Sequence, residues 1–132
     1  MTGGGVPRER IEASQQGIVT VLKPKGRLCN DVRPGLEEKL REVTGQGCRR
    51  IVMDMSATSM VDSTGLSVLT YYARALKVKG GRLVLASPAG SFKRIVESCN
   101  LNRTLRICNT LPEAIEAARQ TSNSGRLQKV QA

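Results

Sequence analysis

The fold is decided by residues 51–66, Ile-Val-Met-Asp-Met-Ser-Ala-Thr-Ser-Met-Val-Asp-Ser-Thr-Gly-Leu, where a strand pattern changes into a helix pattern. The first part, residues 51–55, is a short apolar run bounded by turn residues, which is typical of a buried strand. Residues 56–61 are predicted to form a loop, and a helix is predicted to begin at Asp62 and to end at Gly80-Gly81. The apolar stripe of this helix consists of Leu66, Leu69, Ala73 and Leu76.

Upstream of this segment, the sequence predicts a hairpin and a helix. β-Branched residues around Ile11 and at 18–22 bracket Gln15-Gln16-Gly17, as in two antiparallel strands joined by a turn. Pro34 suits the first turn of a helix, which is predicted to stop near Gly45-Gln46-Gly47. The buried face of that helix is predicted to contain Val32, Leu36, Leu40 and Val43, which recur at helical spacing.

Downstream, strands and helices alternate. Residues 83–86 and 105–108 are compact apolar runs that predict strands. Ser87-Pro88 has the chemistry of an N-cap followed by a first-turn proline, and Thr110 with Glu113 forms a capping box. A helix is therefore predicted after each strand. The inner faces of these two helices are predicted to be Phe92, Ile95, Val96 and Cys99, and Ala114, Ile115 and Ala118.

The order of these elements predicts an α/β fold. Because successive strands joined through helices cross over right-handedly, we expect a central, mostly parallel sheet with an antiparallel edge hairpin and about four helices. The chain has 132 residues, which is enough for one domain only. We place this domain at residues 8–121, between a flexible lead at 1–7 and a polar, flexible tail at 122–132.

The composition is that of a globular protein, with 39% hydrophobic and 24% charged residues. No apolar run approaches the roughly 18 to 20 residues that span a bilayer, and the first residues lack the apolar centre of a signal peptide. We therefore expect a cytoplasmic protein without a membrane span.

The residue types exclude most catalytic chemistry. The sequence has no histidine, which removes histidine-based triads, imidazole metal sites and phosphohistidine relays. Its cysteines form no C-x-x-C pair, and no phosphate-binding loop is present. We therefore predict no catalytic residue, no metal site and no cofactor, and expect that the protein is not an enzyme. The cysteines, predicted to be isolated thiols, are Cys29, Cys48, Cys99 and Cys108.

The formal net charge is +10, and it is unevenly distributed along the chain. Between Arg74 and Arg106 lie eight basic residues and only one acid, Glu97, so one side of the fold could carry most of the positive field. Such a surface could attract an acidic protein, a nucleotide or a nucleic acid, or it could be a plain solvated surface. Few aromatic residues are available as stacking platforms for single strands.

Residues 62–65, Asp-Ser-Thr-Gly, stand where the central helix is predicted to begin. At a helix N-terminus the first N–H groups lack intrahelical partners and the dipole favours negative charge, so Asp62, Ser63 or Thr64 could cap the helix. A phosphate on Ser63 or Thr64 would be tolerated for the same reason. Gly65, without a side chain, leaves the neighbouring hydroxyl open to another protein. Taken by itself, the segment could also be a plain N-cap.

The chain resembles the STAS domains of bacterial anti-sigma factor antagonists in Asp62-Ser63-Thr64-Gly65-Leu66, in the strand at 51–55 and in residues 80–85. The similarity extends from about Ile18 to Ala118. It implies that Ser63 is phosphorylated by a partner that is both an anti-sigma factor and a GHKL-type serine kinase, which supplies ATP and Mg. Thr64 would be the secondary acceptor.

The resemblance also implies a partner switch. The unphosphorylated form would bind the anti-sigma factor and release the sigma factor, phosphorylation at Ser63 would end that binding, and a phosphoserine phosphatase would reverse the modification. No direct nucleic-acid partner is expected.

One departure concerns the turn after the second predicted strand. In the family a Gly-x-Leu/Ile-Asp turn commonly contributes to the partner-facing surface, whereas here Gly26-Arg27-Leu28 is followed by Cys29, Asn30 and Asp31. Either Asp31 takes over the polar role or recognition tolerates its absence. The excess of basic over acidic residues is a second departure, because the family needs no basic surface.

The predicted partner face combines this loop with the exposed side of the central helix. Residues that avoid the apolar stripe point outward at 3.6 residues per turn, and tyrosine and arginine are enriched in binding hot spots. The predicted partner-binding residues are Asp62, Thr64, Gly65, Ser67, Thr70, Tyr71, Arg74, Asn30, Asp31 and Arg33.

Two alternatives remain. A receiver domain has similar length and alternation, and Asp54 superficially suits its phosphoacceptor, but the acidic pair after the first strand and the lysine after the last strand are missing. The second alternative is a STAS regulatory or structural subunit of a transport or signalling complex, in which a basic surface meets acidic partners.

Overall fold

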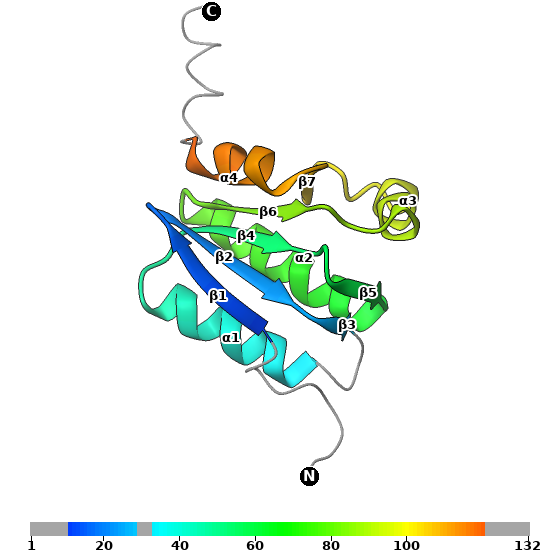
Figure 1. The fold of residues 1–132 in the computed structure, drawn as a ribbon, viewed down its shortest axis with the longest axis horizontal. Helices are drawn as coiled ribbons and strands as arrows, with labels where there is room; N and C mark the ends of the chain where they lie inside the picture. Colours follow the sequence, from blue (N-terminus) through cyan, green and yellow to red (C-terminus); the bar gives the residue numbers. More distant parts are fainter. Residues whose placement is uncertain (1–10, 29–32, 121–132) are drawn as a thin grey trace, which may run out of the picture.

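The computed structural model describes residues 11–28 and 33–120. A five-stranded sheet forms its centre, with the strand order β1-β2-β4-β6-β7 (Figure 1). The first pair is antiparallel and all other pairs are parallel, as the sequence predicts. The strands are β1 (Ile11–Gln16), β2 (Val19–Pro24), β4 (Arg50–Asp54), β6 (Arg82–Ala86) and β7 (Arg106–Cys108).

Four helices follow the strands in the described residues: α1 (Arg33–Gly45), α2 (Ser63–Val78), α3 (Gly90–Ser98) and α4 (Leu111–Arg119). This arrangement confirms the predicted α/β fold. The predicted boundaries at 1–7, 8–121 and 122–132 depend on residues outside the described part of the chain, as do the predictions on Cys29, Asn30, Asp31 and Val32.

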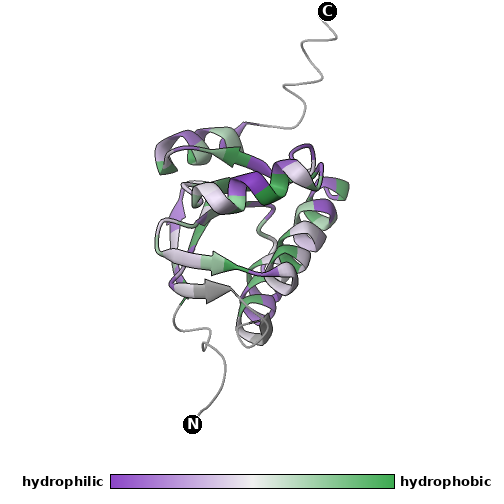
Figure 2. Ribbon diagram, turned by 90° about the vertical axis from the view of Figure 1, so that its right-hand side faces the viewer, coloured by the Kyte–Doolittle hydropathy of each residue, from purple (hydrophilic) through white to green (hydrophobic). Residues whose placement is uncertain are grey.

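The sheet separates two apolar clusters. Leu22, Ile51 and Leu85 face one side, where they pack against α1, α2 and α3. Val52, Val84 and Ala86 face the other side and pack against the alanines of α4. Apolar and polar residues alternate along the helix ribbons in Figure 2, as expected of helices that are half buried.

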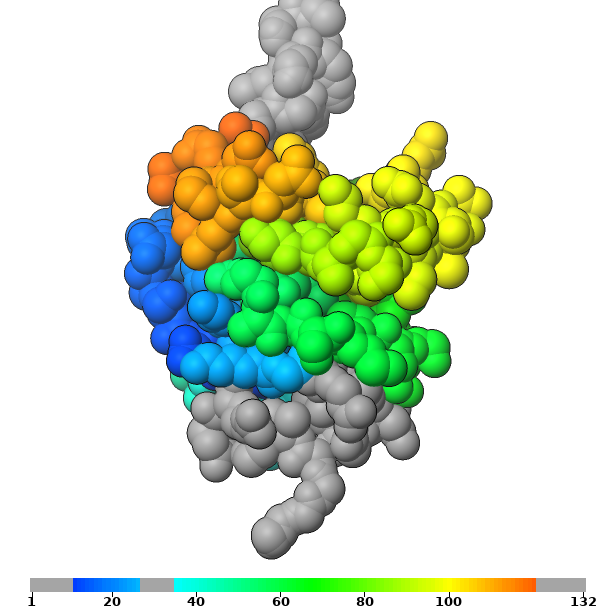
Figure 3. Space-filling model, turned by 45° about the vertical axis from the view of Figure 1, so that its right-hand side comes forward, coloured from blue at the N-terminus to red at the C-terminus, as the bar shows by residue number. Residues whose placement is uncertain are grey.

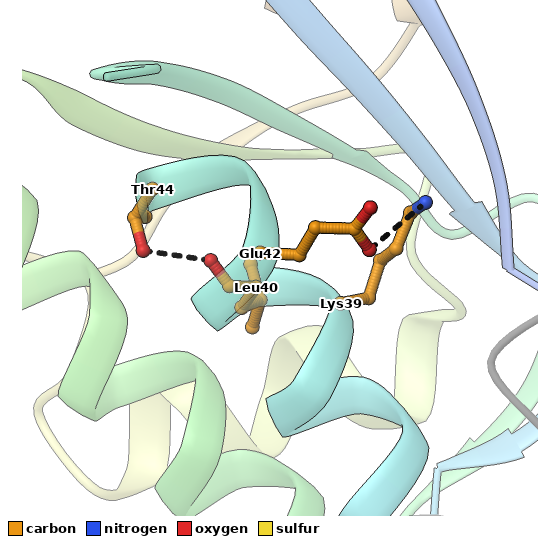
Figure 4. A network of polar contacts seen from close by, with 4 residues as sticks. All are labelled: Lys39, Leu40, Glu42 and Thr44. Atoms are coloured by element: carbon orange, nitrogen blue, oxygen red, sulfur yellow. Dashed lines mark hydrogen bonds and ion pairs between the residues drawn. The ribbon is translucent and has the colours of Figure 1, made fainter. Parts of the chain in front are cut away.

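The predicted apolar stripes of α1 and α2 are confirmed almost throughout. Leu36, Leu40 and Val43 of α1 are buried, and on α2 only Leu66 is partly exposed. Two local contacts stabilise the second half of α1 (Figure 4). Thr44 Oγ1 donates to the Leu40 carbonyl at 2.8 Å, and Lys39 pairs with Glu42 at 3.6 Å.

The prediction of a loop at residues 56–61 is wrong in its second half. Residues Thr58–Val61 form strand β5, which pairs in parallel with β3 (Gly26–Leu28) in a separate two-stranded sheet. Thr58 is buried and its hydroxyl donates to the Pro24 carbonyl at 3.0 Å. The strand depends on a distant partner only three residues long, so no local apolar alternation indicates it.

The predicted start of α3 also needs correction. Its N-cap is Ala89, which makes no side-chain cap hydrogen bond. Ser87 instead has a φ of 54°, and its hydroxyl donates to the Asn109 carbonyl at 3.0 Å, so it ties β6 to the residues after β7. On the predicted inner face of α3, Phe92 and Val96 are buried, whereas Ile95 and Cys99 are exposed.

The start of α4 agrees with the prediction. Thr110 is the N-cap, and its hydroxyl accepts from the Glu113 N–H at 3.3 Å. Ala114 and Ala118 are buried, and Ile115 packs at the edge of the same cluster. Among the described residues, Cys48, Cys99 and Cys108 are free thiols, and no helix is long and apolar enough to cross a membrane.

Candidate functional site

The start of α2 is fixed by Asp62. This residue has extended backbone angles, and its Oδ1 accepts a hydrogen bond from the Gly65 N–H at 3.0 Å. Of the three side chains that could cap the helix, the structure therefore assigns the cap to Asp62. The cap satisfies one of the N–H groups that lack an intrahelical partner and leaves the hydroxyls of Ser63 and Thr64 for other uses.

Ser63 is the first residue of α2, and its side chain is exposed. Its carbonyl accepts a hydrogen bond from the Ser67 hydroxyl at 2.9 Å, but among the described residues its own hydroxyl has no hydrogen-bond partner. Thr64 is only partly exposed. Ser63 is thus the more accessible of the two predicted acceptors.

The electrostatic setting suits an added anion. The N-terminal end of a helix carries a partial positive charge, and its first turn presents N–H groups outward. The first turn of α2 contains no acidic residue. The acidic group next to Ser63 in sequence is the carboxylate of Asp62, which caps the helix. A phosphate on Ser63 would gain from the dipole and lose a comparable amount by repulsion from Asp62.

The exposed side of α2 continues from Ser63 along the helix. Ser67, Tyr71 and Arg74 are exposed, and Thr70 is partly exposed because its hydroxyl turns back to the Leu66 carbonyl at 2.8 Å. The side chain of Tyr71 is 65% exposed. A shallow depression on this side is lined by Ser67, Thr70, Tyr71, Arg74, Ala75 and Val78.

Tyr71 is held in place by its neighbour. The rings of Tyr71 and Tyr72 meet edge to face, with centroids 5.1 Å apart. Tyr72 is partly buried at the contact with α1, and burial raises the pKa of its hydroxyl, with Arg41 and Glu37 acting in opposite directions. An exposed aromatic ring that is already oriented suits a binding anchor.

The predicted loop residues can be placed only by the strands beside them. Leu28 of β3 pairs with Val61 of β5, and the two strands run in parallel, so both end beside the start of α2. Asn30 and Asp31 follow β3 but lie outside the described residues. Arg33 is the first residue of α1.

The surface beside β5 was not among the predicted site residues. A pocket of about 240 Å³ lies between β5 and α3, and Met60 and Ile95 at its rim are 48% and 42% exposed. The two elements are adjacent in Figure 3, where β5 is green and α3 is yellow. The pocket has no local signature in the sequence, because it depends on strand β5, which forms only by pairing with the distant strand β3.

Asp54, the residue that suggested a receiver domain, has a structural role here. It is buried at the end of β4, and its Oδ1 accepts the Ser56 N–H at 3.1 Å. This hydrogen bond stabilises the turn from β4 into β5. No group of three or more potential metal ligands occurs among residues 11–28 and 33–120.

Known proteins of similar sequence and structure were identified. A Thermotoga maritima protein named "Putative anti-sigma factor antagonist" is 29% identical over 79 residues, which are 60% of this chain and 70% of that protein. The crystal structure of the Thermotoga maritima protein of that description superposes with a TM-score of 0.79 at 23% identity, covering 86% of this chain and 97% of that one.

The chain is also similar to SpoIIAA, a Bacillus anti-sigma factor antagonist whose structure is known in unphosphorylated and phosphorylated forms. The TM-scores are 0.67 and 0.66 at 20% and 21% identity, and the alignments cover 83% of this chain and 97% and 99% of SpoIIAA. At these identities the likeness shows the fold. The family itself is shown by a match to the STAS domain over residues 10–114, and the chain therefore belongs to the STAS-domain family.

Proposed function

We propose that this chain is a cytoplasmic anti-sigma factor antagonist that is switched by phosphorylation of Ser63. In its unphosphorylated form it binds an anti-sigma factor that is also a GHKL-type serine kinase, and the sigma factor is released. Phosphorylation ends the binding, and a phosphoserine phosphatase restores it. The observation that carries this proposal is the exposed Ser63 hydroxyl, without a hydrogen-bond partner in the described residues, at the start of a helix that Asp62 caps.

The comparisons support the same role. The curated relative bears the name of an anti-sigma factor antagonist, and SpoIIAA exists in the two forms that such a switch requires. The chain contains no histidine, so a role as a binding protein and a kinase substrate suits its chemistry better than catalysis.

The proposed partner face is the exposed side of α2 together with the residues that follow β3. A kinase that phosphorylates Ser63 must cover the start of α2, and the depression along the helix extends the contact toward Arg74. Asn30, Asp31 and Arg33 are included because β3 ends beside β5. The remaining members are Asp62, Thr64, Gly65, Ser67, Thr70 and Tyr71.

The switch follows from the difference between an exposed and a buried phosphate. A phosphoserine carries about −1.5 to −2 charges at pH 7, and on the free surface this charge stays hydrated. Inside an interface the same group must be desolvated unless the partner supplies matched donors, which costs several kcal/mol. A loss of about 4 kcal/mol lowers affinity roughly a thousand-fold, which is enough to release the partner.

The phosphorylation site is tested with the cognate kinase and ATP. Wild-type protein and the Thr64→Ala variant are expected to be phosphorylated, whereas Ser63→Ala is expected to remain unmodified, as measured by mass spectrometry. Equal modification of Ser63→Ala and the wild type would overturn the assignment. Calorimetric titration of the partner with phosphorylated and unmodified protein then tests the switch, and equal affinities would refute it.

The partner face is tested by alanine substitution at Tyr71 and Arg74. Each substitution is expected to weaken binding of the partner by about 1 kcal/mol or more, since an anchoring tyrosine or arginine typically contributes that much. Arg94→Ala on α3 serves as a control of the same kind, because Arg94 is exposed but lies off α2. Unchanged affinity in both α2 variants, with the fold intact by circular dichroism, would place the interface elsewhere.

A further inference from the structure

A second charged surface lies at the opposite end of the strands from Ser63. Basic residues occur in sequence where β4, β6 and β7 begin and where α2 and α4 end. The starts of β4 and β6 and the ends of α2 and α4 lie at the left of Figure 1. The predicted basic segment 74–106 is therefore divided, because Arg74 and Arg94 lie on α2 and α3 outside this surface. We call this surface the basic end; it comprises Arg49, Arg50, Lys77, Lys79, Arg82, Arg106 and Arg119.

Several of these guanidinium groups are held in fixed positions. Arg49 donates to the Lys79 carbonyl at 2.9 Å, directly after α2. Arg50 donates to the carbonyls of Ala118 and Gln120 at 3.0 and 2.8 Å, and Arg82 donates to the Ala117 carbonyl at 3.0 Å. These bonds satisfy carbonyl groups at helix C-terminal ends, where cations are favourable. Each guanidinium has five N–H donors, so others remain for a ligand.

Apart from Arg119, which pairs with Glu116, the basic residues of this end form no ion pair with another described residue. Arg50 and Arg82 are register partners on β4 and β6, and Arg106 projects from β7 on the same face of the sheet. None of the three forms an ion pair with another described residue. Burial, reinforced by repulsion from Arg106 and Arg50, lowers the pKa of Arg82.

The acidic groups near this end are already engaged. Glu42 of α1 pairs with Lys39, as Figure 4 shows, and Glu116 of α4 pairs with Arg119 at 3.0 Å. The sequence after Gln120 contains Arg126 and Lys129 and no acidic residue. The excess of positive charge at the basic end therefore needs compensation from another molecule or from solvent ions.

Two exposed aliphatic side chains lie among these charges. Ile18, at the turn of the β1–β2 hairpin, is 60% exposed and lines a depression with Arg49 and Arg50. Val78, the last residue of α2, is 86% exposed. A phosphate backbone has no apolar group that could pack against these side chains, whereas a protein partner can provide an apolar residue that does so. Arginine, which predominates over lysine here, is also enriched at protein interfaces.

We infer that the basic end binds an acidic segment of a protein partner, in which glutamate or aspartate side chains accompany an aliphatic residue. The carboxylates would pair with preorganised guanidinium groups, and the aliphatic residue would contact Ile18. The basic end is separated from Ser63 by the length of α2, whose 16 residues span about 24 Å. This exceeds the Debye length of about 8 Å at physiological salt, so a charge at Ser63 is screened from the basic end, although Val78 beside the basic end also lines the depression along α2.

Fluorescence anisotropy with labelled peptides tests this inference on the full chain. The probes are a short peptide of Glu-Glu-Leu repeats and a matching peptide of Glu-Glu-Ser repeats. The first is expected to bind with an affinity that falls as salt is added. The variant Lys79→Gln/Arg106→Gln is expected to bind it about five-fold more weakly, since two exposed ion pairs are removed. The fold should persist, because both side chains are exposed and make no hydrogen bond with the described residues.

The matched control is Arg94→Gln/Arg103→Gln, which changes the net charge by the same amount at two exposed residues outside the basic end, neither of which makes a side-chain hydrogen bond with another described residue. It is expected to keep its affinity within about two-fold. Ile18→Ser is expected to weaken binding of the Glu-Glu-Leu peptide and to leave that of the Glu-Glu-Ser peptide unchanged. The experiment involves neither Ser63 nor the kinase, so its failure would leave the proposed function untouched.

Three results would overturn the inference. Equal losses in the two double variants would mean that net charge alone attracts the peptide. An absence of binding to either peptide would remove the site. Tighter binding of a short DNA duplex than of the acidic peptides, with Ile18→Ser having no effect, would mean that the basic end recognises phosphate and not protein.

Discussion

The two ends of the parallel strands use their polar side chains in opposite ways. Where β5 leads into α2, the Asp62 carboxylate caps the helix and the neighbouring Ser63 hydroxyl is left exposed. At the basic end, Arg49, Arg50 and Arg82 are bonded to the carbonyls that end α2 and α4. One end therefore carries a group available for modification, while the other holds helices and strands together.

Helix electrostatics explains this division. A helix presents unsatisfied N–H groups and partial positive charge at its start, and carbonyls with partial negative charge at its end. An acceptor such as Asp62 therefore suits the start of α2, and arginines suit the ends of α2 and α4. Substitutions at the two ends should accordingly differ in their effect on stability.

The largest effect is expected for Gly81→Ala at the basic end. A Cβ at this position would overlap the backbone carbonyl of Arg49, which cannot move without disturbing the pairing of β4 with β6. We expect the free energy of unfolding to fall by about 3 kcal/mol or more, as for a severe overpacking change. Urea denaturation followed by circular dichroism measures this loss.

Gly90→Ala, at the other end of the strands, is the matched control. No atom lies within 4 Å of the added Cβ, and Gly90 is the first residue of α3. Alanine there is expected to be neutral or to stabilise by about 0.5 to 1 kcal/mol. Similar destabilisation by both substitutions would show that the basic end is no more tightly constrained than the other end.

A smaller effect is expected for Arg82→Met, which keeps the aliphatic length but removes the bond to the Ala117 carbonyl. The loss should be about 1 to 2 kcal/mol, reduced by relief of the repulsion from Arg50 and Arg106. Arg106→Met, which breaks no hydrogen bond with described residues, should change stability by less than about 0.5 kcal/mol. An equal loss in the two variants would contradict a capping role for Arg82.

The two ends also differ in how far sequence predicts them. The start of α2 was predicted from a few consecutive residues, because an N-cap and the stripe that follows it are local features. The basic end could not be predicted from consecutive residues, because Arg50 and Arg119 lie outside the basic segment 74–106. Only the strand register brings Arg50 beside Arg82, and only the position of α4 brings the last turn of that helix, which contains Arg119, to both of them. The segment's charge predicted a basic surface but not its location.

The same distinction explains the two errors within the fold. Strand β5 exists because Thr58 and its neighbours meet β3 across an interval of more than two dozen residues, and a four-residue strand has too little pattern to indicate this. Ser87 has suitable cap chemistry, but its tertiary bond to Asn109 takes precedence. In both cases a long-range contact overrides a local preference.

Asp62→Ala tests how much the cap contributes at the Ser63 end. Loss of the bond to the Gly65 N–H is expected to cost about 1 kcal/mol. Asp62→Asn keeps an acceptor at the same position and should retain most of the stability, which separates the hydrogen bond from the charge. Thermal unfolding of the two variants provides the measurement. Equal destabilisation would mean that the carboxylate charge, and not the cap bond, stabilises the start of α2.

The smallest effect on stability is expected for phosphorylation of Ser63 itself. The dipole of α2 stabilises an exposed anion at its start by about 0.3 to 1 kcal/mol, and repulsion from Asp62 opposes this by a similar, screened amount. The melting temperature of the phosphorylated protein should therefore stay within a few degrees of that of the unmodified protein. In the Asp62→Asn variant the repulsion is absent, so phosphorylation should stabilise slightly. A collapse of the melting temperature on phosphorylation would contradict a local switch, because it would mean that the partner is released through unfolding of the domain and not through the cost of burying the phosphate.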